Sequence, residues 1–195
     1  MAFASIQGKN RQLLFFFEAY EYESYDPTAV PLLLTTLCSC SVPGLFLVCS
    51  FLLCTTCSFH KLILPYLDRG MIYCIAHVRG GGEMGRYWYE EQGKYLNKRN
   101  TFQDFISCAE HLVDNNFTKP ELMATEGRSA GGLLMGNIIN WRPDLFEAVV
   151  AGVPFVDLMN TMCDPTIPLT TGEWEEWGNP NEDKYFDYML SAAHP

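Results

Sequence analysis

The sequence predicts an α/β protein with a mainly parallel sheet flanked by helices. Two observations carry this prediction: apolar runs of strand length alternate with segments of helical period from Gly70 onward, and a Gly-x-Ser-x-Gly turn follows one of the runs. With 195 residues and 48% hydrophobic content, the chain can bury one core. We therefore expect one globular unit.

The first predicted strand is 71–78, a β-branched and aromatic run that suits a central strand buried on both faces. A loop rich in glycine and aromatic residues leads to a predicted helix. Its apolar residues follow the 3.6-residue period: Phe102, Phe105, Ile106, Ala109, Leu112 and Val113. We expect Asn100 or Thr101 to cap this helix and Asp104 to stabilise its first turn.

The pattern then repeats. Residues 122–126 predict a second strand, 130–140 a second helix that stops before Pro143, and 148–153 a third strand. Strands and helices in this order predict right-handed parallel crossovers. Ligands are then expected at the carboxyl ends of the strands.

The turn at Ser129 has the pattern of a nucleophile. A serine hydroxyl is a weak nucleophile until a sharp strand-to-helix turn exposes it beside a base. Gly127 and Gly131 leave room for so tight a turn. Ala130 follows, and its backbone N–H would start the helix and point at a developing oxyanion. The alternative is a Gly-Ser turn without chemistry.

A second glycine motif competes with this interpretation. Gly80 to Gly85 fit G-x-G-x-x-G after a strand, with Asp104 about twenty residues further on, which is the dinucleotide fingerprint. However, Glu83 would place a carboxylate where the pyrophosphate binds, and residues 86–89 are bulky where close packing is needed. We therefore expect no nucleotide and no other cofactor.

The charge distribution excludes one class of partner. There are 13 Lys and Arg against 23 Asp and Glu, a formal net charge of −10, so a nucleic-acid partner is not expected. From Pro143 to Pro195, Lys184 faces ten acidic residues: Asp144, Glu147, Asp157, Asp164, Glu173, Glu175, Glu176, Glu182, Asp183 and Asp187. This region suits a cationic partner.

The eight cysteines do not form the pattern of a secreted disulfide framework. Five of them fall in one apolar stretch: Cys38, Cys40, Cys49, Cys54 and Cys57. Cys54 and Cys57 with the nearby His60 are an incomplete set of zinc ligands, because a second pair is missing. We predict no metal site.

The uncharged run 42–59 has almost the length of a membrane span. It admits three interpretations: a transmembrane helix, buried strands, or a segment foreign to the ancestral fold, and we favour the last. The N-terminus lacks the pattern of a signal peptide. We expect a cytoplasmic protein, with membrane attachment through 42–59 as the alternative.

Three segments together resemble the oligopeptidase B branch of the prolyl oligopeptidase family, serine peptidases S9. They are HVRGGGEMGRYWYEEQGK at 77–94, EGRSAGGLLMG at 126–136, and VAGVPFVD through TTGEWEEWGNP at 150–180. The resemblance runs from about Leu67 to Tyr188. We therefore expect an atypical N-terminal segment, 1–66, and a partial catalytic domain, 67–195.

The resemblance implies an incomplete α/β-hydrolase-type fold and a peptidase that cleaves short peptides after basic residues. Ser129 would be the nucleophile and the Ala130 N–H an oxyanion donor. Glu173 and Glu175 match the glutamates that hold the basic side chain of the substrate. Carboxylates bind Arg or Lys through charge-assisted hydrogen bonds, and the acidic C-terminal region agrees with this role. The alternative is a solvated acidic turn.

Two departures from the family bear on activity. After 31–34 the family has a segment whose tyrosine completes the oxyanion hole, whereas TTLCSCSVPGLF stands here, so a donor worth about 3 kcal/mol is expected to be lost. An altered splice or a gene-model insertion would explain that run. In the family, the acid and the histidine of the triad lie beyond the position of Pro195, as the order Ser, acid, His implies.

The residues that remain are not expected to replace that triad. We do not assign Asp157 or His194 to the triad, and we predict structural or solvated roles for the four histidines: His60, His77, His111 and His194. We also expect no counterpart here of the propeller that filters substrates by size in the family. The chain is therefore expected to be a partial domain that lacks the base and has lost most of its activity. The alternatives are a non-catalytic fragment that binds peptides or a partner, and a membrane-anchored α/β-hydrolase-like protein.

Overall fold

The computed structural model describes residues 5–8, 11–17, 33–39, 46–49, 64–69, 71–82 and 84–193. Its strands are β1 (Ser5–Gly8), β2 (Arg11–Phe17), β3 (Leu33–Ser39), β4 (Phe46–Cys49), β5 (Ile72–His77), β6 (Met123–Arg128) and β7 (Ala148–Gly152). Its helices are α1 (Leu64–Leu67), α2 (Arg86–Glu90), α3 (Arg99–Asp114), α4 (Ala130–Trp141), α5 (Leu158–Cys163), α6 (Thr170–Trp177) and α7 (Asp183–Ala193), with 3-10 turns η2 (Tyr95–Asn97) and η3 (Pro120–Leu122).

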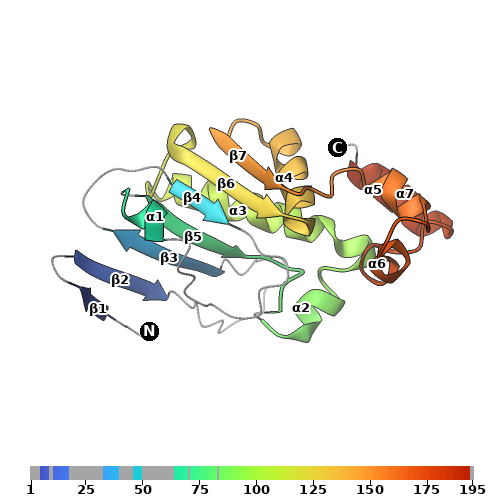
Figure 1. Ribbon diagram of the computed structural model, residues 1–195, viewed down its shortest axis with the longest axis horizontal. Helices are drawn as coiled ribbons and strands as arrows, with labels where there is room; N and C mark the ends of the chain where they lie inside the picture. Colours follow the sequence, from blue (N-terminus) through green and yellow to red (C-terminus); the bar gives the residue numbers. More distant parts are fainter. Residues whose placement is uncertain are drawn as a thin grey trace.

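The described strands form one sheet in the order β1-β2-β3-β5-β4-β6-β7 (Figure 1). The side from β5 to β7 is parallel, and β1, β2 and β3 extend it through antiparallel pairs. The predicted strands at 71–78, 122–126 and 148–153 are confirmed as β5, β6 and β7, and β5 is interior as predicted. The antiparallel extension was not predicted, because residues 1–30 show no strand periodicity.

Strand β4 lies inside the apolar run 42–59 and separates β5 from β6. These four residues therefore form a strand inside the sheet, whereas the rest of the run, with Cys54 and Cys57, lies outside the described residues. Strands from both sides of the proposed boundary at residue 66 pair in one sheet. Within the described ranges, no helix is both long and apolar enough to cross a membrane.

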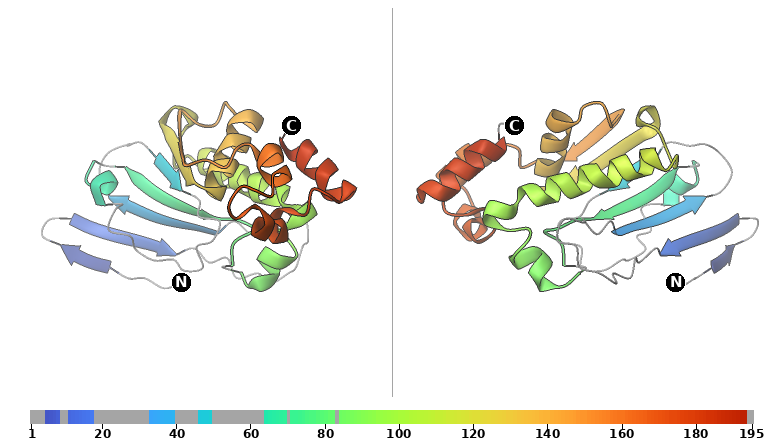
Figure 2. Two further views of the ribbon diagram at one scale, coloured as in Figure 1. Left: turned by 45° about the vertical axis from the view of Figure 1, so that its right-hand side comes forward. Right: turned by 180° about the vertical axis from the view of Figure 1, so that it is seen from behind.

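Helices α3 and α4 pack against each other on one face of the sheet (Figure 2). The core between them and the strands includes Cys74, Phe105, Ala109, Met123, Leu134, Met135 and Ile138, all fully buried. Of the apolar residues predicted to face the core, Val113 is partly buried and the others are buried. The helical period at 102–113 therefore identified the buried face of α3 correctly.

The predicted cap of α3 is wrong. The helix begins at Arg99 after Lys98, which makes no side-chain capping bond, so Asn100 and Thr101 lie inside it. Both side chains bond to earlier backbone instead: the Thr101 hydroxyl donates to the carbonyl of Arg79 at 2.6 Å, and the Asn100 amide donates to another carbonyl at 2.9 Å. These bonds tie the start of α3 to the loop after β5, which sequence reasoning could not foresee.

Asp104 is also outside the first turn of α3, contrary to prediction. It is buried, and its carboxylate accepts three hydrogen bonds from Arg79: from the backbone N–H at 2.9 Å, from Nε at 2.8 Å and from Nη2 at 2.6 Å. A Cβ on Gly93 would lie 2.2 Å from the Cα of Gly80, so the glycine loop is packed against protein. Asp104 is thus engaged by Arg79 and not placed to bind a ribose.

The described cysteines differ in burial, which allows a test of the fold. We expect iodoacetamide to modify the exposed Cys163 in the folded chain and to reach Cys74 and Cys108 only after unfolding. Burial raises the pKa of the Cys108 thiol well above its usual range, so little reactive thiolate forms. Peptide mapping by mass spectrometry, with and without urea, measures this. Equal modification of Cys108 and Cys163 without urea would contradict the packing of α3.

Candidate active site

Ser129 occupies a strained turn between β6 and α4. Its φ of 57° and ψ of −117° lie outside the regions that non-glycine residues favour, and such strain is typical of functional sites. Its N–H donates to the carbonyl of Gly152 at 3.0 Å, and its carbonyl accepts from the N–H of Gly132 at 2.8 Å. The backbone is held from both sides while the side chain is exposed. This is the geometry of a nucleophile elbow.

Two glycines make this turn possible through close backbone packing. A Cβ on Gly127 would lie 2.3 Å from the carbonyl oxygen of Gly131, which agrees with the small neighbour that the sequence predicted there. A Cβ on Gly132 would lie 2.5 Å from the Cα of Pro154. This second approach, which brings the segment after β7 against α4, was missed. In the sequence, only the consecutive glycines 131 and 132 indicated this close approach.

Ala130 is the first residue of α4. At this position a backbone N–H has no acceptor within its own helix. Among the described residues, it also takes no part in the backbone hydrogen bonds found outside helices and strands. The N–H therefore remains available beside the exposed Ser129, at the helix end whose dipole favours negative charge.

The two described histidines form no hydrogen bond with Ser129. His77 ends β5 and is 3% exposed. His111 lies in the last turn of α3, which leads to the start of β6, whereas Ser129 follows the end of β6. Within the part of the chain that the structure describes, the Ser129 hydroxyl makes no hydrogen bond. His60 and His194 lie outside the described residues.

Asp157 caps a helix. One of its carboxylate oxygens accepts from the N–H of Asn160 at 3.2 Å, and the other from the Asn160 side chain at 2.8 Å. This is the usual role of an aspartate at the start of a helix, here α5. These bonds are consistent with leaving Asp157 out of the triad.

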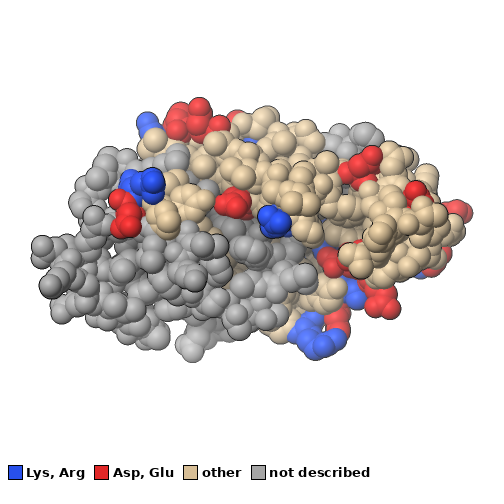
Figure 3. Space-filling view, viewed as in Figure 1, with Lys and Arg blue, Asp and Glu red and all other residues tan. Residues whose placement is uncertain are grey.

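Helices α5, α6 and α7 gather beyond the carboxyl ends of the parallel strands (Figure 1), and acidic side chains lie over this end of the molecule (Figure 3). Glu173 and Glu175 are both exposed on α6. Glu173 accepts a hydrogen bond from the indole N–H of Trp177 at 3.0 Å. Glu175 has no hydrogen bond or ion pair with other described residues. The two predicted glutamates are thus accessible but differ in their contacts.

The third glutamate of α6, Glu176, is used by the fold. It forms an ion pair with Lys98, which is only 3% exposed, and accepts a hydrogen bond from the Tyr89 hydroxyl at 3.4 Å. Burial lowers the pKa of the Lys98 ammonium although Glu176 opposes this shift. Burial, with the nearby Glu176, raises the pKa of Tyr89 to about 12. Sequence reasoning missed this pair, whose residues are far apart in the chain.

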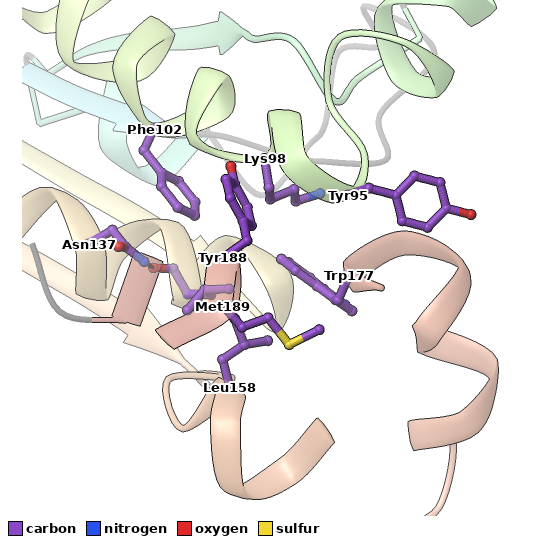
Figure 4. Close-up of a pocket in the computed structure, with 9 residues that line it drawn as sticks. Tyr95, Lys98, Phe102, Asn137, Leu158, Trp177, Tyr188 and Met189 are labelled. Carbon is purple, nitrogen blue, oxygen red and sulfur yellow. Dashed lines mark hydrogen bonds between the residues drawn. The ribbon is translucent and has the colours of Figure 1, made fainter. Parts of the chain in front are cut away.

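Trp177 connects α6 to the turn at Ser129. Its ring centroid lies 5.5 Å from that of Phe155, and the Phe155 N–H donates to the Ser129 carbonyl at 3.3 Å. The Lys98 ammonium lies 4.4 Å from the centroid of the indole ring, and Figure 4 shows the two side chains close together at the edge of a small pocket. The sequence held no signal for this arrangement.

The turn at Ser129 and helix α6 fall within one region of family similarity. The profile of the prolyl oligopeptidase family matches residues 57–195. The chain belongs to this family. The expected resemblance is therefore confirmed, and prolyl oligopeptidases are serine peptidases with the α/β-hydrolase fold.

Curated relatives from the prolyl oligopeptidase family agree with the profile. The chain is 55% identical over 135 residues to "Protease 2" of Moraxella lacunata, which covers 69% of this chain and 19% of that protein. It is 53% identical over 127 residues to "Dipeptidyl aminopeptidase BI" of Pseudoxanthomonas mexicana, covering 65% and 17%. The chain thus spans less than a fifth of the length of these relatives.

Solved structures show the same fold. Oligopeptidase B from Leishmania major aligns with a TM-score of 0.83 at 52% identity, covering 95% of this chain and 26% of that one. Oligopeptidase B from Trypanosoma brucei, with covalently bound antipain, aligns with a TM-score of 0.84 at 52% identity, covering 96% and 27%. The expected α/β-hydrolase fold is therefore confirmed, and the chain corresponds to part of it.

Proposed function

We propose that this chain is part of the catalytic domain of a serine peptidase that hydrolyses short peptides after Arg or Lys. The observation that carries the proposal is the exposed Ser129 in its strained turn, with the N–H of Ala130 beside it at the start of α4. Ser129 is the nucleophile, and the Ala130 N–H stabilises the oxyanion.

The preference for a basic residue rests on Glu173 and Glu175. Both carboxylates are exposed at the carboxyl end of the sheet, where ligands of parallel α/β proteins bind. A guanidinium or ammonium group that meets either carboxylate would form charge-assisted hydrogen bonds with it. The similarity to oligopeptidase B supports this assignment. Peptides are the proposed partners and the cytoplasm the proposed location.

The general base is proposed to come from outside the described residues. Neither His77 nor His111 forms a hydrogen bond with Ser129, and Asp157 caps α5. A serine hydroxyl without a base retains little of its rate, because the members of a triad act as a unit. The 195-residue chain alone is then expected to be nearly inactive. Residues 1–66 remain proposed as an atypical segment and 67–195 as the catalytic part.

A fluorophosphonate probe tests these assignments. We expect the chain to be phosphonylated only slowly, because no base activates Ser129, and we expect imidazole in the buffer to accelerate the reaction in proportion to its concentration. Ser129→Ala should abolish the reaction with and without imidazole. Gel fluorescence against time measures the rate, and Ser107→Ala, on α3, is the matched control.

The two parts of the proposal fail differently. Labelling that survives Ser129→Ala would mean that another residue reacts, and Ser129 would not be the nucleophile. Rapid labelling without imidazole that still depends on Ser129 would support the nucleophile but show that the chain itself supplies a base. Absence of labelling even with imidazole would favour a non-catalytic peptide-binding fragment.

A further inference from the structure

The three glutamates of α6 have different partners, although they lie within four residues. Glu176 is paired with the buried Lys98 and Glu175 has no partner among the described residues, whereas Glu173 accepts a hydrogen bond from the indole N–H of Trp177 at 3.0 Å. We propose that Trp177 is a positioning residue for substrate recognition: its N–H orients the Glu173 carboxylate toward the basic side chain of the peptide. This inference rests on the proposed function.

The indole is suited to this task because it is fixed on several sides. Trp177 is 3% exposed, its ring packs against Phe155 with an interplanar angle of 56°, and the Lys98 ammonium lies 4.4 Å from the ring centroid. Figure 4 shows Trp177 beside the pocket with Lys98 next to it. An exposed glutamate is otherwise free to adopt several rotamers. A hydrogen bond from a fixed donor reduces that freedom before the ligand binds.

The indole ring of Trp177 also connects the Glu173 carboxylate to the turn that holds Ser129. Phe155, which contacts the indole at 5.5 Å between ring centroids, donates its backbone N–H to the Ser129 carbonyl at 3.3 Å. The contacts from Ser129 to Glu173 therefore run through Phe155 and Trp177. This connection relates the position of a bound basic side chain to the bond that Ser129 attacks.

The indole bond uses one oxygen of Glu173 and leaves the other, Oε1, with no hydrogen-bond partner among the described residues. A carboxylate can accept several hydrogen bonds, so one oxygen can bind the indole while the other faces a guanidinium. Glu176 cannot take over this task, because its carboxylate is paired with Lys98. The orientation of Glu173 thus depends on the N–H of Trp177.

The replacement Trp177→Phe tests the proposal, because it removes the N–H and keeps an aromatic ring against Phe155. The ligands are two fluorescein-labelled peptide amides, Ala-Ala-Arg and Ala-Ala-citrulline, which differ in charge but hardly in shape. We expect the ratio of their affinities, measured by fluorescence anisotropy, to fall about fivefold in Trp177→Phe, the usual effect of one hydrogen bond. General damage to the fold would weaken both peptides and leave the ratio unchanged.

Trp174→Phe is the matched control, since Trp174 lies on the same helix but donates its indole N–H to the backbone carbonyl of Met162 at 3.1 Å. Its affinity ratio should equal that of the unchanged chain. An unchanged ratio in Trp177→Phe, or an equal loss in Trp174→Phe, would overturn the inference.

Glu173→Gln separates this inference from the proposed function. We expect it to lower the affinity ratio by about tenfold, because a charge-assisted bond is lost. Trp177→Phe should then have no additional effect in the Glu173→Gln background, since it acts through that carboxylate. An additional loss in the double variant would refute the positioning role. If Glu173→Gln itself leaves the ratio unchanged, the inference falls, and the basic substrate class then depends on Glu175 alone.

Discussion

Replacing Gly127 with alanine is expected to destabilise the folded chain by about 3 kcal/mol, near the upper end of overpacking effects. The new Cβ would lie 2.3 Å from the carbonyl oxygen of Gly131 and 2.7 Å from its carbonyl carbon. These are backbone atoms at the start of α4, so the helix must shift rather than a side chain rotate. The midpoint of urea unfolding, followed by circular dichroism, measures the loss.

Gly172→Ala is the matched control for this prediction. Gly172 lies inside α6, and a Cβ there would have no atom within 4 Å. Alanine is the better helix former, so this variant should gain about 0.5–1 kcal/mol. A Gly127→Ala chain as stable as the original would mean that β6 and α4 do not approach as closely as described. The structural basis for the exposed Ser129 would then be lost.

The turn at Ser129 was predictable because its causes are local. Gly127 and Gly131 lie two residues before and after the serine, and the flanking strand and helix each carry their own periodicity. The cap of α3 was not predictable, because Asn100 and Thr101 are good capping residues whose side chains bond to backbone brought close by the loop after β5. Tertiary contacts decided between two locally reasonable arrangements.

Helix α6 shows that sequence patterns also fail to predict tertiary partners at the candidate site. The family motif identified Glu173 and Glu175, and the charge count agreed with it. Nothing in the spacing distinguishes Glu176 from its neighbours, since its partner Lys98 is 78 residues away. Charge patterns therefore indicate the kind of ligand. Only the folded structure shows which carboxylates are already bonded within the protein and which remain available to that ligand.

Replacing Lys98 with methionine is expected to destabilise the chain by about 3–5 kcal/mol, because it leaves the Glu176 carboxylate with little solvent and without its cation. The side chains of Lys98 and Glu176 are 4% and 17% exposed. The double variant Lys98→Met/Glu176→Met should recover most of the loss, since two apolar side chains of similar volume can fill a buried ion-pair site. Thermal and urea unfolding of the variants measure both effects.

Lys184→Met is the matched control, because Lys184 forms an ion pair with Glu182 at 3.2 Å on the surface, where both side chains are more than half exposed. Its unfolding midpoint should not change, since solvent screens such pairs. If Lys98→Met is as mild as Lys184→Met, then the Lys98 pair contributes no more than a surface contact. If the double variant is no more stable than Lys98→Met, the loss comes from removing the ammonium that lies over the Trp177 ring rather than from the unpaired carboxylate of Glu176.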